Sequence, residues 1–117
     1  MSKTNFVQLI GNLGQKPELI TTAGNKILCS FSMATHDHSK DEHGNKVTRT
    51  EWHNVVAFDN IATLLHKFTD RGARVMIQGR LHTRQYVDKQ NNNRYSTEIV
   101  VEEVLFLDAN KQDTPTA

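Results

Sequence analysis

The sequence predicts a mainly β domain whose long strands close into a five-stranded barrel, with one helix between the third and fourth strands. Two observations lead to this fold class. Five stretches alternate apolar and polar residues as strands do, whereas a single stretch carries apolar residues at helical spacing. Glycines also interrupt the long strands, which favours closure into a barrel over an α+β domain, the alternative that element order leaves open.

The five predicted strands are bounded by turn residues such as glycine, proline and asparagine. They comprise 5–11, with a short extension at 19–22, then 26–35, a strand containing 50–58, then 74–87 and 94–107. Within 26–35, apolar side chains alternate with Ser30 and Ser32, so one face of this strand belongs to the core. Gly79 interrupts 74–87, and we expect a bulge or sharp bend there.

The helix is predicted over 59–68, where apolar residues recur at i, i+3, i+4 and i+7 from Ile61 onward. Asp59 is expected to be its N-cap. The polar stretch between Thr35 and Val47 is predicted to be a hairpin loop turning at Gly44 and Asn45. Histidines and carboxylates in this stretch could suggest a metal site. A hydrated loop is the simpler interpretation, because the stretch lacks a cysteine ligand or a helical histidine pair.

Length and composition limit the functional classes. The 117 residues correspond to one domain, assigned to 1–108, with 109–117 as a short flexible tail. No apolar run approaches the roughly 20 residues of a membrane span. The single cysteine cannot form an intramolecular disulfide, which is consistent with a reducing cytoplasm. Neither a phosphate-binding glycine loop nor a nucleophile-elbow serine occurs, so we predict no enzyme activity, no metal and no cofactor.

Positive charge is concentrated in one segment, although the net charge is only +1. Between residues 71 and 94 the chain carries Arg71, Arg74, Arg80, Arg84, Lys89 and Arg94, against Asp88 alone. Strict alternation along 74–87 would place three of these arginines and Tyr86 on one face. Cations that meet phosphates beside rings that stack on bases suit an unpaired nucleic-acid strand. A solvated sheet face with a core tyrosine is the other interpretation that these residues leave open.

The single tryptophan poses a similar question. In the strand containing 50–58, Trp52, Asn54 and Phe58 share one face. A lone tryptophan is more often largely buried than exposed, so the residue type by itself favours a place in the core.

Five motifs occur in chain order, LIGNLG at 9–14, FSMAT at 31–35, TEWH at 50–53, GRLHTR at 79–84 and RYSTEIVV at 94–101. Along residues 3–107 these motifs resemble those of bacterial single-stranded DNA-binding proteins. They follow the order of that family at close to its spacing. The resemblance implies an OB-fold, a homotetramer, and sequence-tolerant binding and protection of single-stranded DNA in replication, repair and recombination. It also implies a bacterial cytoplasmic, nucleoid-associated protein without catalytic activity.

The resemblance further assigns roles to individual residues. Trp52 and Phe58 match base-stacking aromatics, and this reverses the core interpretation of Trp52. Tyr86 and Ser39 stand where the family commonly has tryptophans, so we expect weaker stacking. The full predicted DNA-binding set is Trp52, Phe58, Tyr86, Arg84, Arg71, Arg80, Arg74 and Asn54. His53 and Asn5 are assigned to the oligomer interface.

Two other functions compete with DNA binding. One is an OB-fold accessory module of the primosome or protein-interaction type, with weak DNA binding. The other is a metal-dependent nucleic-acid enzyme that would use the histidines of 36–43. Residues 109–117 do not match the acidic tip ending in phenylalanine that the family carries. The resemblance leaves replication and repair proteins open as partners, although this tip is absent from this sequence.

Overall fold

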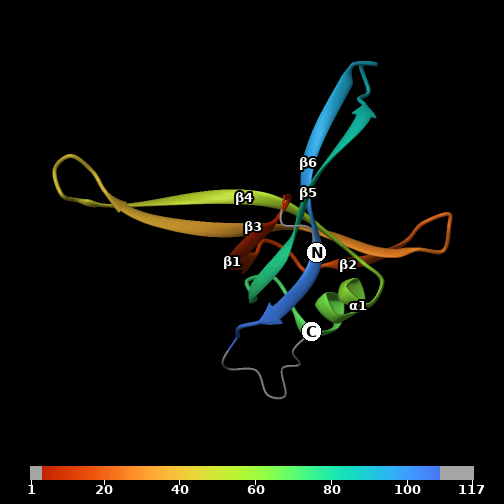
Figure 1. Cartoon of the computed structure of the whole chain (residues 1–117), viewed down its shortest axis with the longest axis horizontal. Coiled ribbons are helices and arrows are strands. Elements are labelled where there is room, and N and C mark those ends of the chain that lie inside the picture. Colours follow the sequence, from red (N-terminus) through yellow and green to blue (C-terminus); the bar gives the residue numbers. More distant parts are fainter. Residues whose placement is uncertain (1–3, 109–117) are drawn as a thin grey trace.

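Five strands form a closed barrel, and three hairpins project from it in different directions (Figure 1). The computed structural model describes residues 4–108. The barrel strands are β1 (Val7–Leu13), β3 (Ile27–Lys40), β4 (Lys46–Phe58), β5 (Arg74–Val87) and β6 (Asn93–Phe106). The short β2 (Glu18–Thr21) pairs with β3, and the helix α1 (Asp59–Phe68) connects β4 to β5. None of the described helices is long and apolar enough to cross a membrane.

The barrel closes because β1 pairs with two different strands. Most of β1 runs antiparallel to β5, and its last residues, Asn12 and Leu13, pair with Ala34 and Met33 of β3. The remaining neighbours follow the order β5, β6, β4, β3, with β4 and β6 as the parallel pair. This is the predicted OB-fold, a five-stranded barrel with its helix between the third and fourth barrel strands.

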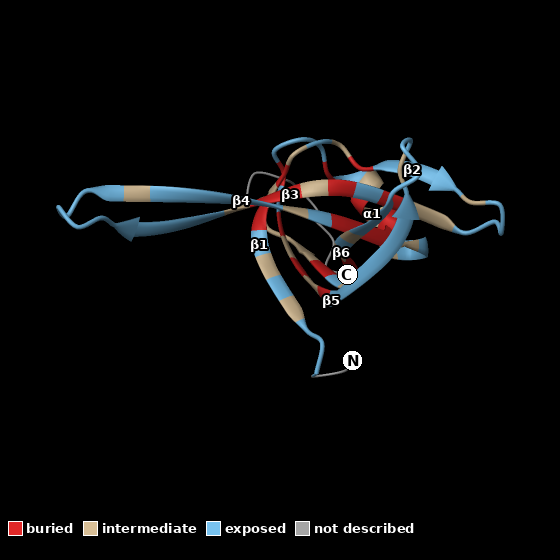
Figure 2. Ribbon diagram, turned by 90° about the horizontal axis from the view of Figure 1, so that it is seen from above, coloured by how far each residue is buried: buried red, intermediate tan, exposed pale blue. Residues whose placement is uncertain are grey.

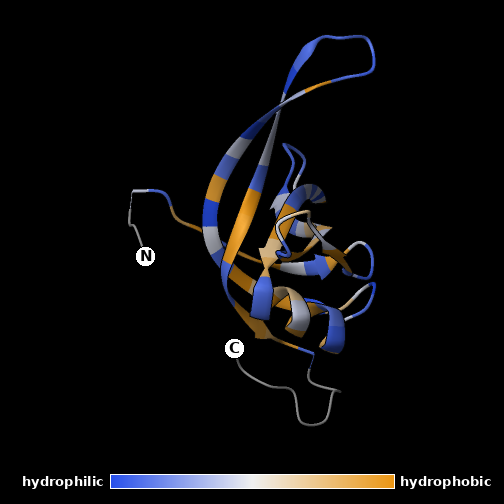
Figure 3. Ribbon diagram, turned by 90° about the vertical axis from the view of Figure 1, so that its right-hand side faces the viewer, coloured by the Kyte–Doolittle hydropathy of each residue, from blue (hydrophilic) through white to orange (hydrophobic). Residues whose placement is uncertain are grey.

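The interior of the barrel is filled by the apolar residues that alternate along the strands (Figure 2). From β3 and β4, the side chains of Cys29, Phe31, Met33, Val55 and Ala57 are buried. Burial raises the pKa of the Cys29 thiol to about 11, so this cysteine is a neutral core residue. Hydropathic colouring confirms that apolar residues gather in the barrel, while the far end of the β5–β6 hairpin is hydrophilic (Figure 3).

The helix packs its apolar face against the barrel. Ala62 and Leu65 are fully buried, and Phe68 meets Phe106 of β6 edge-on, with ring centroids 6.1 Å apart. The expected N-cap is wrong, because the residue before the helix is Phe58 and no side chain caps the first turn. Asp59 instead occupies the first turn with a φ of 55°, where its carboxylate lies at the positive end of the helix dipole.

The loop prediction between Thr35 and Val47 is also wrong. β3 continues to Lys40 and β4 begins at Lys46, so only the tip is a turn. Polar side chains support this extended ladder, since the imidazole Nδ1 atoms of His36 and His38 lie 3.0 and 3.2 Å from threonine hydroxyls on β4. We call residues 35–51 the β3–β4 arm, and residues 81–97, which extend β5 and β6 in the same manner, the β5–β6 arm.

The bulge expected at Gly79 is present, but the extra residue belongs to β6. Gln78 pairs with Glu103 and Gly79 pairs with Val101, which leaves Glu102 between them without a partner on β5. Alternation along β5 is therefore unbroken, and its arginines keep the same face on both sides of the bulge. A Cβ atom on Gly79 would overlap the carbonyl oxygen of Val100, so only glycine allows this close approach.

This close approach predicts that Gly79→Ala destabilises the barrel. Forcing the strands apart at the bulge should lower the free energy of unfolding by about 1–3 kcal/mol, the usual cost of overpacking. Urea unfolding followed by circular dichroism would measure the change. Gly24→Ala is the matched control, because a Cβ there meets nothing within 4 Å. Equal stability of the two variants would contradict the role given to Gly79.

Candidate nucleic-acid interface

An open groove with a volume of about 660 Å³ crosses the outer face of the barrel. Its floor is apolar and is formed by Leu28 of β3, Val56 of β4 and Val100 of β6. These residues alternate with the core residues of the same strands, so one set of strands supplies both the core and the groove. The groove is open and the floor side chains are aliphatic, which suits a flat ring better than a hydrogen-bonded small molecule.

Cationic side chains stand along the edges of this groove. β5 contributes Arg80 and Arg84, with His82 between them, and Lys26 lies just before β3. Glu98 of β6 is the acidic residue among the lining side chains, and its Oε1 lies 3.6 Å from the Nε of Arg84. The unbroken alternation of β5 explains why its two arginines point into the same space.

Aromatic rings accompany these cations. The ammonium of Lys26 lies 5.5 Å from the centroid of the Phe58 ring, and the guanidinium of Arg84 lies 5.8 Å from that of Tyr86. Both distances are within cation–π range. A ring with a cation at one face can still offer its other surface or its edge to a base. The groove therefore interleaves positive charge with stacking surface.

Trp52 is not a core residue. It lies six positions before Phe58 on the same face of β4, and 62% of its surface is exposed. Its indole passes close to Gly14, where a Cβ atom would come within 2.7 Å of the ring. Asn54 lies between Trp52 and the groove floor and is also exposed, opposite Ser32 of β3. An exposed indole next to an apolar groove has the geometry of a stacking platform.

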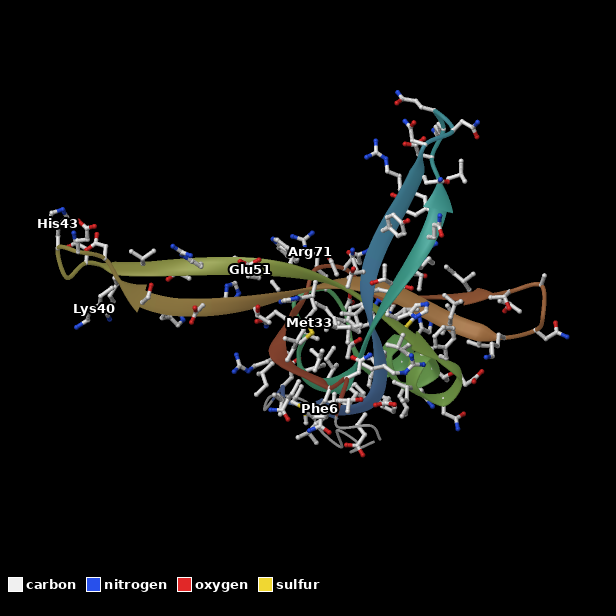
Figure 4. All side chains as sticks on the ribbon, turned by 45° about the horizontal axis from the view of Figure 1, so that its top comes forward. Phe6, Met33, Lys40, His43, Glu51 and Arg71 are labelled. Carbon is white, nitrogen blue, oxygen red and sulfur yellow. The ribbon has the colours of Figure 1, made fainter. Side chains whose placement is uncertain are left out.

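The remaining predicted arginines lie in different places. Arg71 is in the turn after α1, which is tied to the end of β1 by a 2.8 Å hydrogen bond from the Gly72 N–H to the Leu13 carbonyl. This bond brings the turn next to Gly14, and so toward Trp52. Arg74 begins β5 opposite Asn12, far along the strand from Arg84, and does not line the groove. In Figure 4, Arg71 lies at the barrel, whereas Lys40 and His43 mark the far end of the β3–β4 arm.

The two predicted interface residues make hydrogen bonds within the chain. The Nε2 of His53 lies 3.0 Å from the Thr35 hydroxyl across the β3–β4 arm. The side-chain amide of Asn5 donates to the carbonyl of Leu81 and accepts from its N–H, at 3.0 and 2.8 Å. The Asn5 side chain thus continues the hydrogen bonding between the β1 segment and β5 beyond the end of β1.

Both arms end in turns built around an aspartate. Asp41 and Asp88 each accept hydrogen bonds from two backbone N–H groups of their own turn, and Asp88 also accepts one from the Nε of Arg94 at 2.9 Å. The backbone bonds from Asn45 and Asn92 contribute most to a lowered pKa of these two carboxyls. The turns are therefore held by ionised aspartates near neutral pH, and protonation in acid would weaken them.

The histidines of the β3–β4 arm do not assemble a metal centre in the part of the chain that is described. No group of three or more histidine, cysteine, aspartate or glutamate side chains in residues 4–108 is placed to hold an ion.

Three ionisable residues that line the groove, His82, Lys26 and Glu98, were not among the predicted site residues. His82 could have been found, because alternation places it between Arg80 and Arg84. Lys26 carried no signal, since a lysine at the start of a strand usually serves solubility. Glu98 also carried no signal, because a carboxylate is not expected where phosphates bind.

Comparison with known proteins identifies the family of this chain. The model of the single-strand binding protein family matches residues 4–107. The chain belongs to this family. Family members with similar sequences include the single-stranded DNA-binding protein 1 of Xylella fastidiosa, 40% identical over 114 residues, which are 97% of this chain and 83% of that protein.

Other members are longer than this chain. The single-stranded DNA-binding protein 1 of Chlorobaculum tepidum is 41% identical over 106 residues, which cover 90% of this chain and 65% of that protein. For the single-stranded DNA-binding protein of Neisseria meningitidis the identity is 33% over 110 residues, with 94% and 63% covered. This chain therefore spans less than two thirds of the length of these two relatives.

A solved structure supports the same family and fold. It is described as the Plasmodium falciparum SSB complex with ssDNA, and it superimposes with a TM-score of 0.82 at 32% sequence identity. The match covers 92% of this chain and 98% of the other.

Proposed function

We propose that this chain binds single-stranded DNA with little sequence preference and protects it during replication, repair and recombination, without catalysing a reaction. The observation that carries the proposal is the exposed indole of Trp52 on the same outer face as the groove that holds Phe58. Family members named for single-stranded DNA binding, and the solved complex of a related protein with ssDNA, support it.

The mechanism divides the work between rings and cations. Bases stack on Trp52, Phe58 and Tyr86, each worth ~1–3 kcal/mol per stacked base. Phosphates contact Arg80, Arg84 and Arg71, which release the counterions of the strand. Every base has a π-face, and the groove floor offers few hydrogen-bonding groups, so contact of this kind does not read sequence.

The other predicted contacts are secondary in this arrangement. Asn54 lies between Trp52 and the groove floor, where its amide can bond a phosphate or a base edge. Arg74 lies outside the groove, so it contributes only if the strand continues along β5.

The proposal includes assembly, domain limits and location. We place the DNA-binding OB-fold domain at 1–108 and the protein in the bacterial cytoplasm, associated with the nucleoid. We also propose a homotetramer, because one groove offers a short track and several copies would let a strand wrap. His53 and Asn5 are the proposed interface residues, and the intrachain bonds of both would orient them.

Single-stranded DNA should bind much more tightly than duplex DNA of the same length. Stacking requires exposed base faces, which a duplex withholds. Fluorescence anisotropy with matched oligonucleotides would measure both affinities. Equal affinities, or no binding of the single strand, would favour an accessory module that recognises proteins.

Stacking and charge should be separable by salt. Trp52→Ala should weaken binding by ~1–3 kcal/mol per lost stack and leave the slope of log affinity against log salt nearly unchanged. Arg80→Ala should instead flatten that slope by roughly 0.7, the value per neutralised phosphate of a single strand. Titrations at several salt concentrations would measure both variants.

Tyr95→Ala is the matched aromatic control for this pair. Tyr95 is 70% exposed, yet alternation along β6 places it on the face opposite Glu98 and the groove. Its loss should leave affinity unchanged. If Tyr95→Ala weakened binding as much as a folded Trp52→Ala, the groove would not be the stacking surface.

The oligomeric state should respond to His53. The larger phenol in His53→Tyr cannot keep the 3.0 Å contact with Thr35 in the same geometry, so a subunit contact at this point should weaken. Light scattering at micromolar concentration should give a tetramer for the parent and a smaller species for the variant, with unchanged circular dichroism. A tetramer of undiminished stability would remove His53 from the interface.

A further inference from the structure

Glu98 is a negatively charged residue in a groove that is proposed to bind an anion. The other ionisable residues that line the groove are Lys26, Arg80, His82 and Arg84. Glu98 lies deeper than its neighbour, because 17% of its side chain is exposed against 56% for Arg84. A carboxylate at this depth lies under the path of a phosphate that approaches Arg84.

The contact between Glu98 and Arg84 is loose. Among residues 4–108 there are two ion pairs, and both join the Nε of an arginine on the β5–β6 arm to a carboxylate. Arg94 and Asp88 are 2.9 Å apart and hydrogen-bonded, which suits a pair that holds a turn. Arg84 and Glu98 are 3.6 Å apart, beyond hydrogen-bonding distance, so only Coulomb attraction links them.

From this geometry we propose that Glu98 is a built-in competitor for Arg84, which occupies the arginine in the free protein and limits its affinity for single-stranded DNA. The proposal rests on the proposed function. Binding exchanges one partner of Arg84 for another, because a phosphate replaces the carboxylate. No hydrogen bond has to break, so the exchange is fast in both directions.

The exchange leaves Glu98 without its partner and close to the bound strand. His82 lies directly opposite Glu98 in the ladder, but it is not at salt-bridge distance from the carboxylate. Lys26 and Arg80 do not pair with the carboxylate either. Repulsion between this carboxylate and the nearby phosphates opposes binding. Glu98 therefore keeps the strand exchangeable, as a protein that must later yield its DNA requires.

The opposite role for Glu98 makes the opposite prediction. If the carboxylate positioned Arg84 for phosphate, removing its charge would release the guanidinium and weaken binding. If Glu98 competes, removing its charge strengthens binding. The sign of one substitution separates the two.

The test uses Glu98→Gln, Arg84→Gln and the double variant, titrated with a dT oligonucleotide across several salt concentrations. Glu98→Gln should bind roughly two- to fivefold more tightly, the range expected for one partly exposed ion pair. Its salt slope should steepen by up to roughly 0.7, because Arg84 then neutralises a phosphate with no carboxylate left behind. Arg84→Gln should weaken binding more in the Glu98→Gln background than in the parent chain.

Glu103→Gln is the control for a change of net charge. Glu103 lies on the same strand, is exposed and does not line the groove, so its substitution should leave affinity within error. Unchanged or weaker binding by a folded Glu98→Gln variant would overturn the proposal, and so would equal gains from both glutamine variants. If the parent chain itself failed to bind the oligonucleotide, the proposed function would fall instead.

Discussion

The pairing of β1 with two strands at once is the constraint on which the rest of the structure depends. β1 runs along β5 as far as Asn12, and at Asn12 and Leu13 its other edge pairs with β3, which converts a curved sheet into a closed barrel. A side chain at Gly11 would overlap the carbonyl oxygen of Ala34, so the two strands can meet only because position 11 has no Cβ. Without closure, β5 and β4 would not curve toward each other, and the groove between Phe58 and Arg84 would not exist.

Closure also gives each barrel strand two separate tasks. On β4, Val55 and Ala57 face the interior, while Val56 and Phe58 face the groove one residue away. A change in register by a single residue would exchange the two sets, so the core fixes the position of the binding surface. The apolar interior thus stabilises the fold and at the same time orients the outer side chains. The platform at Trp52 shares this origin, because it stands on the same face as Phe58.

Periodicity in the sequence was sufficient to predict the barrel and much of the groove. It was insufficient for segments whose structure depends on strand pairing and not on burial. Alternation predicted the buried face of β3 and the bounds of β5, and apolar residues at helical spacing predicted the helix at 59–68. It could not predict that the polar residues from His36 to Lys40 form a ladder, since neither face of the arm is buried and no apolar period marks it. The strand that carries the bulge was equally hidden, because a glycine signals a close approach without telling which strand has the extra residue. For Trp52, composition favoured the core and only the family resemblance favoured the surface. Glu98 and Lys26 matter through their neighbours in space, which no linear pattern encodes.

The two arms determine where the structure opens first. Each continues the barrel strands for many residues beyond the core, held by its ladder and by an aspartate-based turn, with almost no apolar packing (Figure 2). Elements with exposed backbone hydrogen bonds and few buried contacts open locally at a much lower free energy than the core does. The barrel is therefore the rigid part of the molecule, and the two arms are more easily deformed. The two arms can open or bend while the barrel keeps its shape.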